Sequence, residues 1–302
     1  MIKRTIVIES PCVLRIKHKQ LVIEREEEVV GTVPVEDIGL LLIENTQVLY
    51  SHHALISVIE NNGAVVLAGI DHNPVGLILP LESNTLQSER FRVQINASVP
   101  TLKRLWQQII QSKIRNQSRL LNNIGITDKR LPILAQKVKS GDPENIEAQA
   151  SRHYWLLLFG RNFRRDRFLG CPNNYLNYGY IILRAATARS LVGSGLLPTL
   201  GIHHHNRYNA YCLADDMMEP YRAFVDKAVY ELLKQYGKND DITKEMKTKL
   251  LQVLESEVDM NGIKYPLMSA LHQSTASLYR CLSGIQKEIE FPTLWEKSAN
   301  TE

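Results

Sequence analysis

The spacing of apolar residues changes near residue 87, and this change limits the possible folds more than any other feature of the sequence. Before residue 87, short stretches of alternating apolar and polar residues are separated by Pro, Gly and Asn, which is typical of β-strands. After it, apolar residues recur at helical spacing in longer segments. We therefore predict an α+β protein with a small N-terminal β-domain, residues 1–86, and a larger all-α domain, residues 87–302.

The expected strands of the first domain cover residues 5–8, 13–17, 20–24, 29–35, 39–43, 64–67 and 75–79. The second and third of them flank a short polar turn and predict a hairpin, and Ser51 is expected to cap one short helix that ends at Glu60. In the second domain, we expect helices over residues 101–121, 142–159, 174–195, 207–236, 242–257 and 268–288. Asp142 followed by Pro143 predicts a helix start, and the polar tail after Pro292 is expected to be frayed.

Length and composition exclude several classes of protein. A chain of 302 residues with 44% hydrophobic content can bury one large core or two modest ones. Its four cysteines are scattered without CxxC spacing, which argues against a zinc ribbon or a disulfide framework. No stretch reaches the roughly 20 apolar residues of a membrane span, and no apolar signal region follows the first residues. We expect a cytoplasmic protein with no membrane partner.

Charge is distributed unevenly along the chain. Residues 1–90 contain 7 basic and 12 acidic residues, whereas residues 91–302 contain 29 basic and 20 acidic residues. The basic residues are densest in residues 101–140, where Asp128 is the only acid, and in a cluster formed by Arg161, Arg164, Arg165 and Arg167. Such a region suits a polyanion such as nucleic acid, although a solvated helix surface is an equally open interpretation.

An acid shares the apolar face of the helix predicted after Asp142. Glu147 falls on that face together with Ala150, Tyr154 and Leu158. Burying an ionised carboxylate without compensation costs on the order of several kcal/mol, so Glu147 needs a cationic partner, a metal ion or an open cleft. From the residue pattern alone, an arginine partner is the more common of these arrangements.

Two further segments carry residue types that bind metals. Three consecutive histidines, residues 203–205, lie between two predicted helices, and because adjacent side chains diverge, only one or two of them can serve one site. On the next helix, Asp215, Asp216 and Glu219 fall along one face. Like charges at this spacing repel, and a cation such as Mg²⁺ or Mn²⁺ would stabilise them. A polar loop and a solvated helix face are the alternatives for each segment taken alone.

Read together, these segments resemble the universal CRISPR-associated integrase family, Cas1, and in particular its type II branch. The matching stretches are residues 142–155 (DPENIEAQASRHYW), 176–184 (LNYGYIILR), 195–198 (GLLP), 200–206 (LGIHHHN) and 213–222 (LADDMMEPYR). The similarity extends over nearly the whole chain, including residues 34–38 of the β-domain.

The resemblance implies a metal set of a glutamate, a histidine and an acid, which fall on Glu147, His204 and Glu219 of this sequence, with Mg²⁺ or Mn²⁺ as the cofactor. Many relatives carry Asp at the third position, and Asp216 is the nearest auxiliary ligand. The resemblance also implies that the β-domain forms a homodimer and binds a dimer of the small Cas2 protein in a heterohexameric complex. Double-stranded DNA, from the protospacer and the repeat array, and other type II adaptation proteins complete the implied partners.

The implied reaction is strand transfer, in which the 3′-hydroxyl of a short duplex attacks a phosphodiester of the repeat array. One phosphodiester replaces another, so no ATP motif is required. The arginine cluster, Arg161, Arg164, Arg165 and Arg167, is expected to hold DNA phosphates. Two alternatives are a metal-dependent nuclease on branched or single-stranded DNA, in which water is the nucleophile, and a non-catalytic DNA-binding scaffold.

Overall fold

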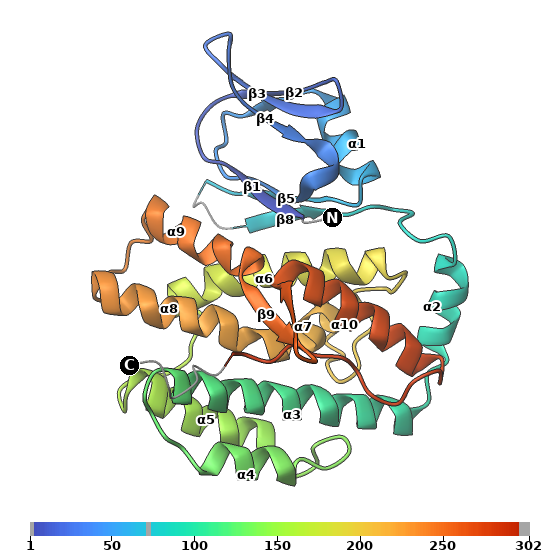
Figure 1. The fold of residues 1–302 in the computed structure, drawn as a ribbon, viewed down its shortest axis with the longest axis vertical. Helices are drawn as coiled ribbons and strands as arrows, with labels where there is room; N and C mark the ends of the chain where they lie inside the picture. Colours follow the sequence, from blue (N-terminus) through green and yellow to red (C-terminus); the bar gives the residue numbers. More distant parts are fainter. Residues whose placement is uncertain (1–2, 71–73, 296–302) are drawn as a thin grey trace.

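The computed structural model describes residues 3–70 and 74–295. Figure 1 shows an N-terminal part that contains two four-stranded sheets and one α-helix, followed by a larger part that is mostly helical. The predicted α+β fold class is therefore confirmed. In the described residues, no helix is both long enough and apolar enough to cross a membrane.

The N-terminal strands form two sheets of different topology. One sheet has the order β1-β5-β7-β8, with β1, β5 and β7 parallel and β8 antiparallel at its edge. The other has the order β4-β3-β2-β6 and contains the predicted hairpin between β2 and β3. The strands are β1 Arg4–Ile8, β2 Val13–Lys17, β3 Gln20–Arg25, β4 Glu28–Pro34, β5 Ile38–Ile43, β6 Leu49–Tyr50, β7 Ala64–Ala68 and β8 Pro74–Ile78. The predicted helix is α1, His52–Glu60, and Ser51 accepts a hydrogen bond from the amide of Ala54 as its cap.

Strand β5 connects the two parts of the molecule. All six of its residues are buried, as expected for an unbroken apolar run covered on both faces. Leu40 and Leu42 belong to the core of the helical part, whereas Leu41 and Ile43 pack into a second cluster with residues of α1. The β1-β5-β7-β8 sheet is therefore shared by both cores. Strand β8 ends at Ile78 and the next helix begins at Gln87.

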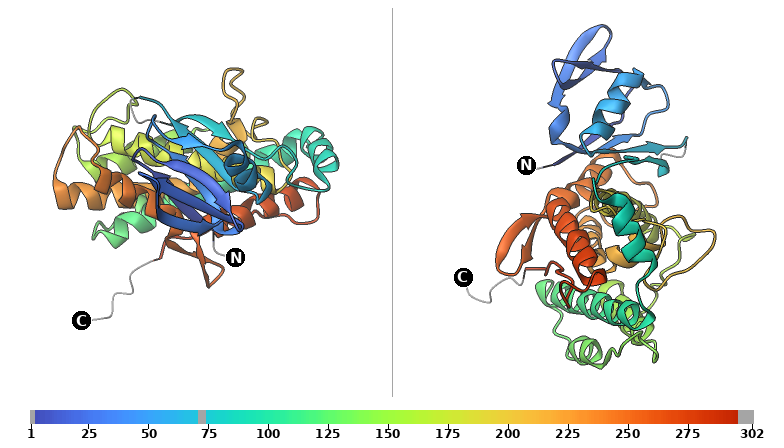
Figure 2. Two further views of the ribbon diagram at one scale, coloured as in Figure 1. Left: turned by 90° about the horizontal axis from the view of Figure 1, so that it is seen from above. Right: turned by 90° about the vertical axis from the view of Figure 1, so that its right-hand side faces the viewer.

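The larger part is a packed array of helices. Figure 2, with Figure 1, places the N-terminal sheets against the end of this array near α6 and α9, and α3, α4 and α5 at the opposite end. The helices are α2 Gln87–Ile95, α3 Val99–Asn123, α4 Arg130–Lys137, α5 Ile146–Phe159, α6 Asn173–Gly193, α7 Cys212–Met218, α8 Arg222–Tyr236, α9 Lys244–Leu251 and α10 Leu267–Leu282.

Several helix boundaries differ from the sequence prediction. Helix α5 begins at Ile146 with Asn145 as its N-cap, because the side chain of Asp142 accepts the amides of Ile146 and Glu147 from outside the helix. Helix α3 is capped by Ser98 and not by Thr101. The single helix predicted over residues 207–236 is two helices, α7 and α8, joined by a 3₁₀ turn, η2 Glu219–Tyr221, which contains a proline.

The C-terminal part is not wholly helical. A hairpin of β9, Glu257–Met260, and β10, Ile263–Pro266, turns at Asn261-Gly262, where both residues have positive φ. The helix predicted over residues 242–257 ends earlier, at Leu251, and a 3₁₀ turn, η3 Gln252–Glu255, leads into the hairpin. The tail predicted to be frayed is packed at Leu294, whose amide donates to Asn116. Residues 296–302 of that tail lie outside the described residues.

Candidate functional site

Glu147 and Glu219 converge on one lysine, Lys113. The Nζ atom of Lys113 lies 2.5 Å from Oε1 of Glu147 and 2.7 Å from Oε2 of Glu219. The three side chains come from α5, η2 and α3, which are distant in sequence. Lys113 is only 7% exposed, so it is not one of the surface phosphate contacts that the basic stretch suggested.

The charges of this cluster compensate one another. Lys113 is the main cause of the lowered pKa of Glu147, and it outweighs the opposing effect of burial. Burial would raise the pKa of Glu219, but Arg222, whose Nε lies 2.9 Å from Glu219 Oε1, and Lys113 together lower it. Burial likewise opposes the charge on Lys113, yet the two glutamates raise its pKa. Both acids and the lysine are therefore charged near neutral pH.

His204 lies on the loop before α7 and is held by a buried acid. Its Nδ1 is 2.5 Å from Oδ1 of Asp216, and this hydrogen bond raises the pKa of the imidazole. Oδ2 of Asp216 accepts the amides of His203 and His204, so one carboxylate fixes both the loop and the ring. With Nδ1 engaged, Nε2 is the nitrogen available to a ligand. Glu219 also raises the pKa of His204, so the two side chains are electrostatic neighbours.

The neighbouring histidines have different surroundings. The ring of His203 stacks on Trp106, with 4.2 Å between centroids and 3° between planes, while His204 meets the same indole edge-on. His205 is exposed. Trp106 and Lys113 are seven residues apart on α3 and therefore share one face. Of the three histidines, His204 is the one that a buried carboxylate orients.

The carboxylates of α7 do not share one cation. Asp215 accepts two hydrogen bonds from Arg184, at 2.6 and 2.5 Å, and Asp216 is bound to His204. Each acid of the predicted stripe thus has its own partner, and the expected mutual repulsion is relieved by pairing. The geometry gives Asp216 the position of a residue that orients His204.

Lys113, Trp106 and Arg222 are parts of this site that were not identified from the sequence. A signal for Lys113 was present, because it falls on the buried stripe of α3 between Ile109 and Ile114. A charged residue on such a stripe needs a buried partner. The partner predicted for Glu147 was an arginine, and the structure provides this lysine instead.

The donor atoms of the site suit a divalent cation in kind. Two carboxylates and an imidazole are ligands that Mg²⁺ or Mn²⁺ accepts. Oε2 of Glu219 is buried and lies 2.7 Å from Nζ of Lys113. Within residues 3–70 and 74–295, no three His, Cys, Asp or Glu side chains are arranged as a metal site. Instead, the Lys113 ammonium lies between the two glutamates, where a metal ion would otherwise balance their charge.

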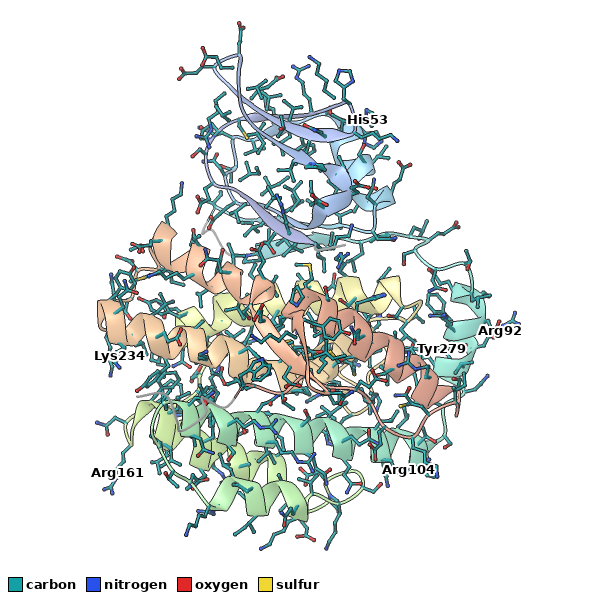
Figure 3. All side chains as sticks on the ribbon, viewed as in Figure 1. His53, Arg92, Arg104, Arg161, Lys234 and Tyr279 are labelled. Atoms are coloured by element: carbon teal, nitrogen blue, oxygen red, sulfur yellow. The ribbon has the colours of Figure 1, made fainter. Side chains whose placement is uncertain are left out.

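The four predicted DNA-binding arginines differ in their surroundings. Arg161, Arg164 and Arg167 are exposed, and Figure 3 shows Arg161 pointing away from the protein. Arg165 is half-buried and hydrogen-bonds the side chains of Asn173 and Asn177, at 3.0 and 2.8 Å. Arg165 therefore stabilises the connection between α5 and α6 through neutral acceptors.

Sequence comparison identifies the relatives of this chain. The profile of the family described as CRISPR associated protein Cas1 matches residues 5–255. The CRISPR-associated endonuclease Cas1 of Neisseria meningitidis serogroup C (strain 8013) is 34% identical over 276 residues, which cover 91% of this chain and 90% of that protein. A CRISPR-associated endonuclease Cas1 of Francisella tularensis subsp. novicida (strain U112) is 29% identical over 174 residues, which cover 50% of this chain and 53% of that protein.

Solved structures share the fold at lower identity. A casposase bound to integration product superimposes with a TM-score of 0.79 at 19% identity and covers 100% of this chain and 96% of its own. A Cas1 protein from Thermotoga maritima gives a TM-score of 0.73 at 17% identity, over 95% of this chain and 99% of its own. A chain of a Cas6-RT-Cas1–Cas2 complex gives 0.72 at 18% identity, over 98% of this chain and 36% of its own. The profile match and the Neisseria relative establish that this chain belongs to the Cas1 family of CRISPR-associated endonucleases and integrases, as the sequence motifs predicted.

Proposed function

We propose that this protein is a metal-dependent DNA integrase of CRISPR adaptation. It would join the 3′-hydroxyl ends of a short DNA duplex to a repeat array by transesterification. The observation that carries this proposal is the convergence of Glu147 and Glu219 on one buried cation, Lys113, beside the oriented imidazole of His204. Such a cluster is arranged to surround positive charge.

Glu147, His204 and Glu219 are the residues that would hold Mg²⁺ or Mn²⁺. Bound there, the ion would favour ionisation of the attacking hydroxyl and offset the charge that develops on the reacting phosphate. Asp216 fixes the imidazole of His204 through Nδ1 and leaves Nε2 for the ligand. Arg222 keeps Glu219 ionised and fixes one of its oxygens.

Partners are proposed on the same grounds. The exposed arginines Arg161, Arg164 and Arg167 would bind phosphates without reading sequence. The N-terminal part would form a homodimer and bind a Cas2 dimer, giving a heterohexamer, because structures of similar fold include a complex with Cas2 and an integration product. Other type II adaptation proteins would select the protospacer, and we place the protein in the cytoplasm.

Strand transfer tests the reaction directly. The protein and a type II Cas2 protein are incubated with Mn²⁺, a plasmid carrying the repeat array, and a short duplex with either 3′-hydroxyl or 3′-deoxy ends. We expect joined products from the first duplex and none from the second. Cut plasmid without joined products would instead support the nuclease, whose nucleophile is water.

Isosteric variants test the site. Glu147→Gln and Glu219→Gln should abolish joining, while Glu144→Gln should not, because Glu144 pairs with Lys139 at the exposed surface on the other side of the α5 N-terminus. His204→Asn should be inactive and His205→Asn active. Inactive His205→Asn with active His204→Asn would contradict the choice of ligand.

Metal binding is tested apart from activity. Mn²⁺ should raise the melting temperature of the wild type and of Glu144→Gln, but not that of Glu147→Gln. An equal rise in all three proteins would mean that the ion binds elsewhere, and no rise in any of them would favour the scaffold.

A further inference from the structure

A cavity of about 620 Å³ lies between the N-terminal sheets and the helical part, and it shares no lining residue with the Glu147 site. Its size is within the range of small-molecule binding sites. The N-terminal part contributes Lys3 and Asn62, and the remaining wall comes from α6, β10 and α10. The lining residues are Lys3, Asn62, Arg189, Ser190, Gly193, Tyr265, Pro266, Met268, Ser269, His272 and Gln273.

Arg189 brings an uncompensated guanidinium to this cavity. Its Nε donates to the backbone oxygen of Asn62 at 2.6 Å, and among the described residues it has no acidic partner. Burial lowers the pKa of Arg189 to about 10, and no carboxylate in the described chain opposes this effect. A guanidinium carries five N–H donors, so four remain for a ligand.

Two further basic residues, Lys3 and His272, line the cavity. No acidic residue is among the described residues that line the cavity. Burial and the charge of Arg189 lower the pKa of Lys3, Asp37 and Glu36 act in the opposite direction, and the Lys3 ammonium donates to the backbone oxygens of Glu36 and Asn61. Burial, Arg189 and Arg90 lower the pKa of His272, which favours its neutral form. Among the described residues that line the cavity, Arg189 is therefore the cation with no acid acting on it, and it supplies the main attraction for an anion. An anion is the ligand that this charge distribution favours.

Capping of α1 explains only part of this arrangement. The bond from Arg189 satisfies a carbonyl just beyond the last turn of α1, which is a common role for a cation. That bond uses Nε alone, so capping does not require the two terminal nitrogens of the guanidinium.

The cavity also offers an apolar surface. Tyr265, Pro266 and Met268 line it together with the polar groups contributed by Asn62 and Gln273. A ligand that carries both a phosphate and a planar base would use both kinds of wall, because arginine binds phosphate oxygens in a fork and apolar side chains cover the faces of a base.

We propose that this interdomain cavity binds a nucleotide, with Arg189 as the main ligand of its phosphate and the residues Tyr265 and Met268 against its base or sugar. A free nucleotide and a nucleotide unit of a DNA strand offer the same chemistry. The site is additional to the proposed integrase centre. Because it joins residues of both parts of the molecule, its occupation should also raise the melting temperature.

Calorimetric titration of the full-length protein with deoxyadenosine monophosphate tests this site. We expect saturable binding to the wild type that is at least roughly tenfold weaker in Arg189→Gln. Gln273→Glu should weaken binding as strongly, because it adds a carboxylate to the cavity at unchanged size. Arg152→Gln is the matched control, since Arg152 is an exposed arginine on α5 with a similar single bond to a backbone oxygen, that of Ala148.

The outcomes separate the possibilities. Wild-type affinity in Gln273→Glu, or no saturation of the wild type, overturns the site, and this holds even if Arg189→Gln does not fold. Equal affinity for inorganic phosphate or for deoxyadenosine overturns the assignment to a nucleotide. Competition by duplex DNA at equal nucleotide concentration assigns the site to a DNA strand, and absence of competition assigns it to a free nucleotide; both results support a phosphate site. The measurement does not depend on strand transfer.

Discussion

Glu219 and Asp226 are buried acids seven residues apart, and the protein stabilises them in opposite ways. Glu219 lies between two cations, Lys113 and Arg222, which lower its pKa although burial would raise it. Asp226 receives hydrogen bonds from two tyrosine hydroxyls, and burial raises its pKa to about 6 in spite of them. One carboxylate is balanced by charge and the other by neutral donors.

The difference also concerns access. Glu147, which shares Lys113 with Glu219, keeps 30% of its side chain exposed, whereas Asp226 is completely buried. A carboxylate pair that is balanced by a cation and open to solvent through one member, Glu147, can exchange that cation for another. A sealed carboxylate held by the hydroxyls of Tyr154 and Tyr180 cannot. Function is therefore expected at the first cluster and stability at the second.

The largest effect is expected from Lys113→Met. Without the lysine, Glu147 and Glu219 lose a shared buried cation, and breaking such a pair costs about 3–5 kcal/mol of unfolding free energy. Chemical denaturation without metal should show this loss. If the cluster exchanges cations, millimolar Mn²⁺ should restore part of the stability of this variant.

Lys139→Met is the control for that experiment. Lys139 pairs with Glu144 at the exposed surface, so its loss should leave stability nearly unchanged. A Lys113→Met protein as stable as the control would show that the buried cluster is not balanced by this lysine.

Asp226→Ala should have the next largest effect and should not respond to metal. It leaves the buried hydroxyls of Tyr154 and Tyr180 without an acceptor, at a cost of about 2–4 kcal/mol. The same denaturation series with and without Mn²⁺ measures both the loss of unfolding free energy and its response to metal. Metal rescue of Asp226→Ala comparable to that of Lys113→Met would remove the distinction between the two clusters.

The pKa of Asp226 predicts a dependence of stability on pH. Because its folded pKa, about 6, is above its ordinary value of 3.8, its contribution is fully present below pH 3.8 and is lost as pH rises through 6. Between pH 4 and 7, the wild type should therefore lose on the order of 2–3 kcal/mol relative to Asp226→Asn. Parallel stability curves for the two proteins would contradict the raised pKa.

The two clusters differ in how far the sequence predicts them. The periodicity of α5 placed Glu147 and Tyr154 on one buried face, and this is correct. The sequence could not identify Lys113 as the partner of Glu147, because the ion pair joins α3 to α5 across 34 residues. Asp226 gave no signal, since one acid on an amphipathic helix usually faces solvent. Long-range pairing is the information that local patterns lack.

The fold shows the same limit. Apolar patterning predicted the strands longer than two residues in the described N-terminal part, among them the continuous apolar run of the fully buried β5 and the mostly exposed β4. The two-residue strand β6 is too short to carry a pattern. Helix ends were misplaced where a local competitor acts, as when the carboxylate of Asp142 caps α5 from three residues outside its N-cap. Asn261 and Gly262 lie between two predicted helices of a domain predicted to be all-α, and the structure forms a β-hairpin there.

Asp216→Asn should have a smaller effect on stability, and this effect should be limited to the cluster of Glu147, Glu219 and His204. Asparagine can still accept the loop amides, but it no longer carries the charge that orients and polarises His204. Loss of such a supporting carboxylate typically lowers metal affinity or activity roughly 10–100-fold. The Mn²⁺ affinity measured by titration and the strand-transfer activity should both fall, while the melting temperature without metal changes little. A large loss of stability without a loss of metal affinity would make Asp216 a purely structural residue.

The smallest effects are expected in the arginine cluster. One arginine there is exposed to solvent and another is bound within the protein, as in the two carboxylate clusters. Arg164 is exposed, whereas Arg165 is held by Asn173 and Asn177 and stacks over Tyr180, 5.4 Å from the ring centroid. If Arg164 binds a phosphate, Arg164→Ala should weaken binding equally on all duplexes and reduce the salt dependence by about one unit of slope. Arg165→Ala should instead lower stability by about 1–2 kcal/mol, because it removes hydrogen bonds that join the loop to α6.

Binding isotherms at several salt concentrations, measured beside thermal melts, separate the two arginines. Asn177→Ala is the control for Arg165, since it removes one acceptor of the guanidinium and leaves its charge in place. Stability should fall in this variant as in Arg165→Ala, and the salt slope should stay that of the wild type. If Arg165→Ala reduces the salt slope as much as Arg164→Ala and leaves the melting temperature unchanged, then Arg165 contacts DNA. A half-buried, hydrogen-bonded arginine would in that case bind DNA as readily as an exposed one. Burial and internal hydrogen bonds would then not distinguish structural from DNA-binding arginines at the protein surface.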